Sequence, residues 1–185
     1  MVSLQTPSGD LGWTAAEFSL PDLDGTPRRF ADVAGEAGTV IAFICNHCPY
    51  VKAMIPRFIA DAAALKAAGV GVAAIMPNDF HAYPDDAPDA MRAFAAETGL
   101  DCPYLLDESQ AVARAYGAVC TPDFFGFDAA GRLVYRGRLD AGRKDPPPAD
   151  APHELRDAML AVATGQGAPE TQLPSMGCSI KWRQG

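Results

Sequence analysis

Two short apolar runs near the middle of the chain are the strongest pattern in the sequence. Residues 39–44 and 69–76 are almost wholly apolar, and the first run is rich in β-branched side chains, as expected for buried strands. Between them, residues 50–68 carry apolar side chains at helical spacing, and Gly69 is placed to end the helix. Two buried strands joined by a helix predict a β-α-β unit with parallel strands.

The rest of the pattern predicts a central mixed sheet flanked by helices, with a hairpin at the N-terminal side that turns at Asp24-Gly25. The further expected elements are helices over 89–98 and 109–116, an antiparallel hairpin of strands 124–127 and 132–136, and an amphipathic helix over 153–164. No internal repeat is visible. We therefore expect one α/β domain over 1–185, with a core of about 10–164 and a C-terminal tail at 165–185.

The motif Cys45-Asn46-His47-Cys48-Pro49 lies where the first strand turns into the long helix. The first N–H groups of a helix have no internal partner, and they favour a thiolate over a thiol. The spacing also places the two sulfurs within reach of a disulfide. This arrangement predicts dithiol–disulfide chemistry. A single C-x-x-C is also half of many zinc sites, but the other cysteines are isolated and no bound metal is expected.

Composition excludes several classes of function. Fifteen basic and twenty-three acidic residues give a net charge of −8, which argues against a general binder of nucleic acid or anionic membrane. No apolar run approaches the roughly 20 residues that a membrane helix needs. The N-terminal residues do not have the pattern of a signal peptide, so a cytoplasmic location is expected. Five cysteines, an odd number, indicate that any disulfide is a working state.

With these elements in place, the sequence resembles the thioredoxin-like superfamily, and within it the AhpC/TSA-type redoxins. The resemblance covers roughly residues 10–164 and is carried by the segments 18–25, 45–49, 121–122 and 128–131. It implies a thioredoxin-like fold and a thiol–disulfide oxidoreductase without a bound cofactor. The implied partners are disulfides and thiols of proteins or small molecules, together with a donor or acceptor protein for electrons.

The resemblance also implies a role for particular residues. Cys45 is expected to be the exposed attacking thiol, with a pKa below the free value of about 8.5, and Cys48 the resolving thiol. Pro122 is expected to be cis, to face the C-x-x-C motif and to present the Thr121 backbone to a partner. His47 has two interpretations: a protonated imidazole that favours the Cys45 thiolate, or a solvated surface histidine.

The sequence departs from its relatives at two points. The strand 40–44 holds no carboxylate, whereas thioredoxin places a buried acid beneath the motif as a proton acceptor. The peroxiredoxin signature Pro-x-x-x-Thr-x-x-Cys, aligned on Cys48, finds Cys45 in place of Thr and Ile41 in place of Pro. The arginine that helps peroxiredoxins bind peroxide also has no match, because Thr121-Pro122 stands in that region. These departures disfavour the usual peroxidase mechanism. A thiol-dependent peroxidase with antioxidant activity is the alternative function, in which Cys48 would be the attacking thiol.

A third interpretation belongs to another class of protein. Copper-delivery proteins of this fold bind metal through a cysteine pair, typically C-x-x-x-C, and a distant histidine. The present spacing is one residue shorter, and the candidates for the histidine are His81 and His153.

The remaining cysteines leave one question open. Cys178 is a possible third redox thiol, or else the tail around it folds back for packing alone, with Trp182 docked on the domain. Cys120, two residues before Pro122, is a further candidate, although inert packing is the favoured interpretation for it. Cys102 is expected to be buried and silent.

Overall fold

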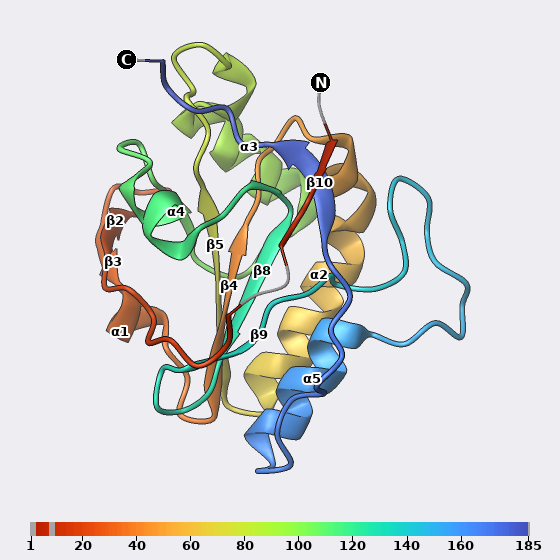
Figure 1. Cartoon of the computed structure of the whole chain (residues 1–185). Coiled ribbons are helices and arrows are strands. Elements are labelled where there is room, and N and C mark those ends of the chain that lie inside the picture. The colour runs from red at the N-terminus through yellow and green to blue at the C-terminus, as the bar shows by residue number, and fades with distance from the viewer. Residues whose placement is uncertain (1–2, 8–9, 185) are drawn as a thin grey trace.

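A five-stranded mixed sheet forms the centre of the computed structural model, which describes residues 3–7 and 10–184 (Figure 1). β4 pairs in parallel with β5 and antiparallel with β8, while β6 and β9 form the two edges. This arrangement confirms the expected mixed sheet. The strand order and bounds are β6 (Tyr104–Leu106), β5 (Val70–Met76), β4 (Gly38–Phe43), β8 (Asp123–Phe127) and β9 (Leu133–Tyr135).

The long helix α2, Pro49–Ala67, is the crossover that joins the parallel strands β4 and β5. Parallel neighbours cannot be joined by a tight turn, so the chain must cross the face of the sheet between them. Gly69 follows the helix with φ +79°, a left-handed conformation that side chains of other residues rarely adopt. The expected β-α-β unit is therefore present, with its helix ending where the glycine predicted.

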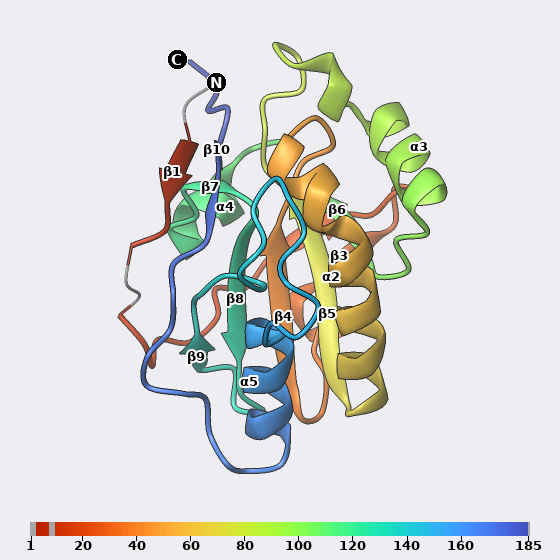
Figure 2. The ribbon, with the colours of Figure 1, turned by 90° about the vertical axis from the view of Figure 1, so that its right-hand side faces the viewer.

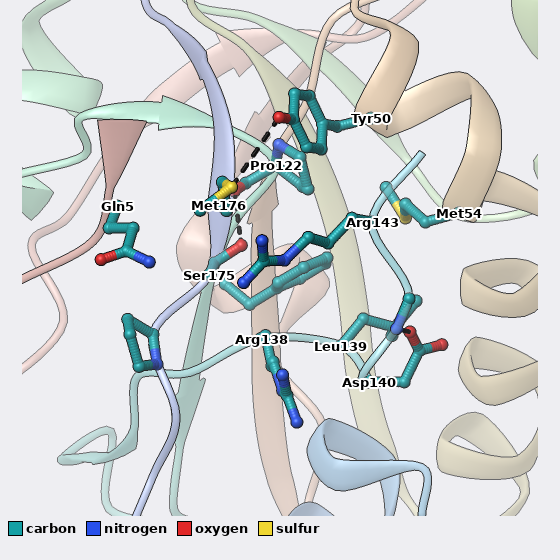
Figure 3. Close-up of a pocket in the computed structure, with 13 residues that line it drawn as sticks. Gln5, Tyr50, Met54, Pro122, Arg138, Leu139, Asp140, Arg143, Ser175 and Met176 are labelled. Carbon is teal, nitrogen blue, oxygen red and sulfur yellow. Dashed lines mark hydrogen bonds between the residues drawn. The ribbon is translucent and has the colours of Figure 1, made fainter. Parts of the chain in front are cut away.

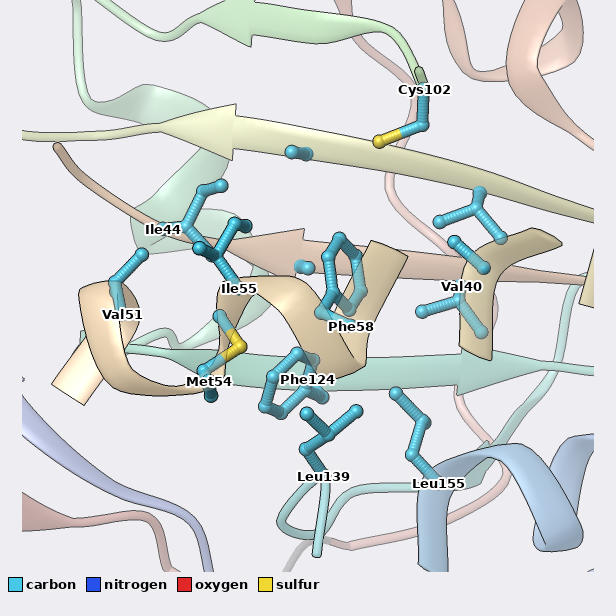
Figure 4. Close-up of a cluster of buried hydrophobic side chains, with 14 of the residues drawn as sticks. Val40, Ile44, Val51, Met54, Ile55, Phe58, Cys102, Phe124, Leu139 and Leu155 are labelled. Carbon is cyan, nitrogen blue, oxygen red and sulfur yellow. The ribbon is translucent and has the colours of Figure 1, made fainter. Parts of the chain in front are cut away.

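Alternation along β4 divides the core into two clusters, one on each face of the sheet. Val40 and Ala42 face α2, together with α3 (Pro88–Thr98) and α5 (Glu154–Ala163), and Figure 4 shows this cluster. Ile41 and Phe43 face the opposite side, which is covered by α1 (Phe30–Val33) and α4 (Ala111–Tyr116). All four side chains are fully buried. A strand covered on both faces must be apolar throughout, which explains the continuous apolar run.

The N-terminal hairpin packs on the α1 side of the sheet, as Figure 1 shows. Its strands are β2 (Ser19–Pro21) and β3 (Pro27–Arg29), which pair antiparallel. In the turn, the Asp22 carboxylate accepts hydrogen bonds from the backbone N–H groups of Asp24 and Thr26, and Gly25 has φ +88°. The turn therefore lies where Asp24-Gly25 predicted it.

A second, three-stranded sheet brings the two ends of the chain together, and the sequence pattern did not predict it. The tail strand β10 (Met176–Ser179) lies between β1 (Ser3–Gln5) and β7 (Cys120–Thr121), antiparallel to both (Figure 2). Beyond β10, Trp182 packs against the second core cluster, and the Arg114 guanidinium lies 4.3 Å from the centre of its ring. The expected docking of Trp182 is thus seen.

Within the described part of the chain, the helices are too short or too polar to cross a membrane.

Candidate active site

Both cysteines of the C-x-x-C motif lie beyond the carboxyl end of β4, but Cys48 is the one that adjoins the helix. α2 begins at Pro49, and Cys48 is its N-cap residue. Cys45 lies in the turn between the strand and the helix. Proline is well suited to the first helical position because the N–H that it lacks would have no partner there. The expectation that Cys45 occupies the helix N-terminus is therefore wrong, and the helix dipole acts chiefly on Cys48.

The segment before β8 crosses over the two thiols. The Thr121–Pro122 peptide bond is cis, as the resemblance implied. The Cys45 sulfur lies 3.2 Å from the Thr121 hydroxyl, and the Cys48 sulfur lies 3.1 Å from the Thr121 carbonyl oxygen. This contact arises because β8 runs antiparallel to β4, so its beginning lies beside the end of β4. Thr121 and Pro122 thus face the motif, as expected.

Neither thiol of the motif is open to solvent. Cys45 and Cys48 are both 0% exposed. The expectation of an exposed attacking Cys45 is therefore wrong. The physical reason is tertiary: β10 pairs with the backbone edge of β7, so the chain's own tail occupies the place beside Thr121 where a partner was expected.

The two thiols differ sharply in acidity. A hydrogen bond from Cys45 lowers the pKa of Cys48 to about 5. Burial of Cys48 acts in the opposite direction, and a hydrogen bond from Cys178 offsets part of that effect. The same hydrogen bond, together with burial and the nearby Asp86 carboxylate, raises the pKa of Cys45 well above its ordinary value. The expected lowering of the pKa of Cys45 is thus wrong, and the thiolate forms on Cys48.

This assignment predicts a titration that can be followed by the ultraviolet absorbance of the thiolate. Absorbance of the reduced protein should rise with a midpoint near pH 5, because Cys48 is a thiol below this pH and a thiolate above it. Cys45→Ala should move the midpoint upward, since it removes the hydrogen-bond donor that is the largest cause of the low pKa of Cys48. Cys102→Ser is the control, because burial raises the pKa of that thiol to about 11. A midpoint that Cys48→Ser leaves in place would contradict the assignment.

A buried carboxylate from a distant loop organises the residues between the two cysteines. Asp86, at the end of the short 3-10 helix η1 (Pro84–Asp86), is 0% exposed. Its carboxylate accepts from the backbone N–H of Asn46 over 2.9 Å and from the Asn78 side chain over 2.8 Å. Asn46 in turn accepts a hydrogen bond of 2.9 Å from the Tyr104 hydroxyl. The turn that carries the motif is therefore held by the loop after β5 and by the first residue of β6.

The same carboxylate pairs with His47. The imidazole Nδ1 lies 2.7 Å from Asp86 Oδ2, and contact with this carboxylate raises the pKa of His47 although partial burial opposes the shift. The ring also stacks on Tyr83, with the ring centres 5.9 Å apart. His47 is thus a partly covered member of an ion pair rather than a solvated surface histidine, and its positive form is attracted to the Cys48 thiolate.

Sequence reasoning missed Asp86, although a signal was present. Loops that follow parallel strands gather at the carboxyl edge of the sheet, where β4 delivers the C-x-x-C motif and β5 delivers the loop that contains Asp86. An acidic residue in a proline-bounded loop after β5 was therefore a candidate to meet the motif. This carboxylate is the buried acid that the strand 40–44 lacks, although it approaches from a different direction.

The three remaining cysteines have different surroundings. Cys178, on β10, places its sulfur 2.8 Å from the Cys48 sulfur. Cys120 is fully buried, its thiol points toward the Pro122 carbonyl over 3.4 Å, and burial raises its pKa. Cys102 lies in the core cluster beside α2 and is buried, as expected. The structure thus brings Cys178 to the motif and leaves Cys102 and Cys120 as packed thiols.

A pocket of about 40 Å³ lies beside the cis-proline (Figure 3). Tyr50 of α2 and Met176 of the tail approach each other across it, with the tyrosine hydroxyl 3.7 Å from the methionine sulfur. Ser175 donates to the Pro122 carbonyl over 2.8 Å. Arg143 contributes a positive charge to the lining. The tail therefore forms one wall of this pocket and ties it to the proline.

One group of residues in the described part of the chain could share a metal ion. Cys45, His47 and Asp86 each offer a ligand atom, and these atoms lie within 4.8 Å of one another. Asp86 is already engaged by the imidazole and by two N–H donors, so the set is explained as an ion-pair network. The group contains neither histidine proposed for copper: His81 pairs with Glu108, and His153 with Asp61.

Comparison with known proteins places the fold and the family. The structure is similar to that of an uncharacterized conserved protein from Geobacillus kaustophilus, with TM-score 0.93 and 43% identity over 100% of this chain and 98% of the other. A hypothetical protein from Sinorhizobium meliloti 1021 gives TM-score 0.90 and 40% identity over 98% and 99% of the two chains. No curated protein matches the sequence.

A more distant structure shows the fold alone. The putative thiol:disulfide interchange protein DsbE from Chlorobium tepidum gives TM-score 0.63 and 24% identity, over 84% of this chain and 99% of the other. The fold is thioredoxin-like, as the sequence predicted. The sequence profile of the AhpC/TSA family matches residues 11–136, a segment that includes the C-x-x-C motif and the cis-proline. The chain therefore belongs to the AhpC/TSA family of redox proteins.

Proposed function

We propose that the protein is a thiol–disulfide oxidoreductase that uses Cys45 and Cys48 for dithiol–disulfide exchange. The observation that carries the proposal is the position of both sulfurs against the residue before the cis-proline: Cys45 Sγ lies 3.2 Å from the Thr121 hydroxyl and Cys48 Sγ lies 3.1 Å from the Thr121 carbonyl oxygen. The lowered pKa of Cys48 is consistent with this role. Membership of a redox family supports it. The partners that this chemistry requires are disulfides of proteins or small molecules and a protein that supplies or accepts electrons.

The acidities reverse the roles expected for the two cysteines. The Cys48 thiolate is the nucleophile, and it attacks a substrate disulfide R–S–S–R to form Cys48–S–S–R and a thiolate RS⁻. Cys45 then loses its proton to a departing thiolate, and its sulfur attacks the Cys48 sulfur. The bond to R breaks, leaving a Cys45–Cys48 disulfide and a second thiolate RS⁻, which takes a proton from solvent. The substrate gains two electrons, and the protein loses them.

Reduction of a protein disulfide such as that of insulin, with a dithiol as electron donor, tests the proposal. Cys48→Ser should reduce turnover to the background rate, because no attacking thiolate remains. Cys45→Ser/Cys178→Ser should form a mixed disulfide on Cys48 and stop there, since both neighbouring thiols are absent. Cys102→Ser should retain full activity. Turnover by wild type no faster than by Cys48→Ser would exclude the proposal.

One observation favours a second candidate, a thiol-dependent peroxidase. The low pKa lies on Cys48, the position that aligns with the attacking cysteine of peroxiredoxins. Against it, Cys45 stands where peroxiredoxins have threonine, and Thr121-Pro122 occupies the region of their peroxide-binding arginine. Consumption of hydrogen peroxide with a thiol donor separates the two. Turnover that survives Cys45→Ser and exceeds disulfide reduction would favour the peroxidase.

A further inference from the structure

Strand β10 places a third thiol directly against the reactive one. In the antiparallel pairing of β10 with β7, Cys178 lies opposite Thr121, whose carbonyl contacts the Cys48 thiol. The sulfurs of Cys48 and Cys178 are 2.8 Å apart, whereas a disulfide bond measures about 2.05 Å. A movement of less than about 1 Å would bond them. This is a cluster of three buried thiols rather than a pair.

The protonation states of the cluster suit an exchange. Burial and the neighbouring Cys48 raise the pKa of Cys178 to about 12, so Cys178 rests as a thiol beside the Cys48 thiolate. Once Cys48 is bound in a mixed disulfide, its negative charge is gone. One of the causes that raises the pKa of Cys178 disappears with it, while the positive charges of Lys181 and Lys144 remain and favour the Cys178 thiolate.

We propose that Cys178 is a third redox residue of this protein, which resolves the mixed disulfide on Cys48 by forming a Cys48–Cys178 disulfide. The inference rests on the proposed thiol–disulfide exchange. In Cys48–S–S–R the Cys178 thiol gives up its proton and its sulfur attacks the Cys48 sulfur. The bond between Cys48 and R breaks, and the released RS⁻ takes the proton to become RSH. The substrate disulfide has then received two electrons from Cys48 and Cys178.

The position of Cys178 on the tail links this step to access. Both sulfurs of the C-x-x-C motif are fully buried, and β10 covers the edge of β7 beside them. A substrate therefore reaches Cys48 when β10 leaves β7, and the return of β10 brings Cys178 back to the Cys48 sulfur. The segment before β10 is largely exposed, with Gly165 and Gly167 in left-handed conformations. Release of the reduced substrate and closure of the site then occur in one step.

The experiment uses an aromatic disulfide reagent whose released thiol is coloured, added to the folded, reduced protein. In Cys45→Ser, Cys178 is the resolving thiol that remains, so both halves of the reagent should be released. In Cys45→Ser/Cys178→Ser one half should be released and the other should stay bound to Cys48. Cys45→Ser/Cys48→Ser should react slowly, because burial raises the pKa of each thiol that remains. Retention of half the reagent by Cys45→Ser would overturn the inference.

Peptide mapping of the oxidised proteins identifies the bond. Trypsin cuts after Lys52 and Lys181, so Cys48 and Cys178 fall in separate peptides that a disulfide would join. We expect the two peptides to be joined by a Cys48–Cys178 disulfide in oxidised Cys45→Ser. In oxidised wild type we expect a mixture of this disulfide and the Cys45–Cys48 disulfide. Wild-type protein that turns over insulin but forms Cys45–Cys48 alone would overturn the inference and leave the proposed function intact. If wild type reduced insulin no faster than Cys48→Ser, the proposed function itself would be wrong.

Discussion

Gly177→Val should expose the buried thiols by lifting the tail strand from the domain. A Cβ atom at Gly177 would lie 2.1 Å from the Thr121 carbonyl oxygen and 2.8 Å from the Pro122 nitrogen, which are backbone atoms that cannot rotate away. Forcing extra atoms into a packed site costs about 1–3 kcal/mol. If the whole cost weakens the pairing of β10 with β7, the fraction of molecules with β10 displaced rises by the corresponding factor. Alkylation of Cys48 should then become roughly 10- to 100-fold faster.

The measurement is the rate at which a thiol reagent modifies Cys48 in the folded protein, followed by mass spectrometry. Ser179→Ala, on the same strand, is the matched control, because it removes atoms and introduces no clash. Its rate should stay near that of wild type. An unchanged rate in Gly177→Val, with the protein still folded, would show that substrate reaches Cys48 without displacement of β10.

Asp86→Ala should be among the most destabilising substitutions in the molecule. The carboxylate is fully buried and engages His47, the Asn46 backbone N–H and the Asn78 side chain. Removing one partner of a buried pair leaves the other groups without compensation and typically costs about 3–5 kcal/mol. We expect a loss of this size in the free energy of unfolding, measured by denaturant titration at neutral or slightly acidic pH.

The destabilisation caused by Asp86→Ala should depend on pH. The pKa of His47 is raised in the folded protein, so the ion pair stabilises the fold at low pH and is lost as pH rises through that raised value. The difference in stability between wild type and Asp86→Ala should therefore shrink with rising pH. Asp85→Ala, at the exposed neighbouring position, should change stability by about 0.5 kcal/mol or less. Equal effects of the two substitutions would contradict the network.

Local pattern was enough to predict most of the sheet and the place of the motif. The continuous apolar runs, the helical spacing between them and Gly69 specified β4, α2 and β5, because period and turn residues act over a few positions. The position of Cys45 and Cys48 after a buried strand followed directly. The helix start was harder: Pro49 begins α2, so the N-cap position falls on Cys48.

Tertiary structure decided how the two thiols divide their acidity and what surrounds them. The hydrogen bond between Cys45 and Cys48 is the largest cause of both pKa shifts and is local in sequence, but its direction depends on the fold. The groups that add to it come from far along the chain: Asp86 lies 40 residues from Asn46, and Cys178 lies 130 residues from Cys48. Acidity depends on burial and on neighbouring charges in space, and neither is written in the local pattern. Strand β10 is short and contains glycine, so its pattern is weak. It forms because β7 offers an unpaired backbone edge, and by pairing with that edge it brings Cys178 against Cys48.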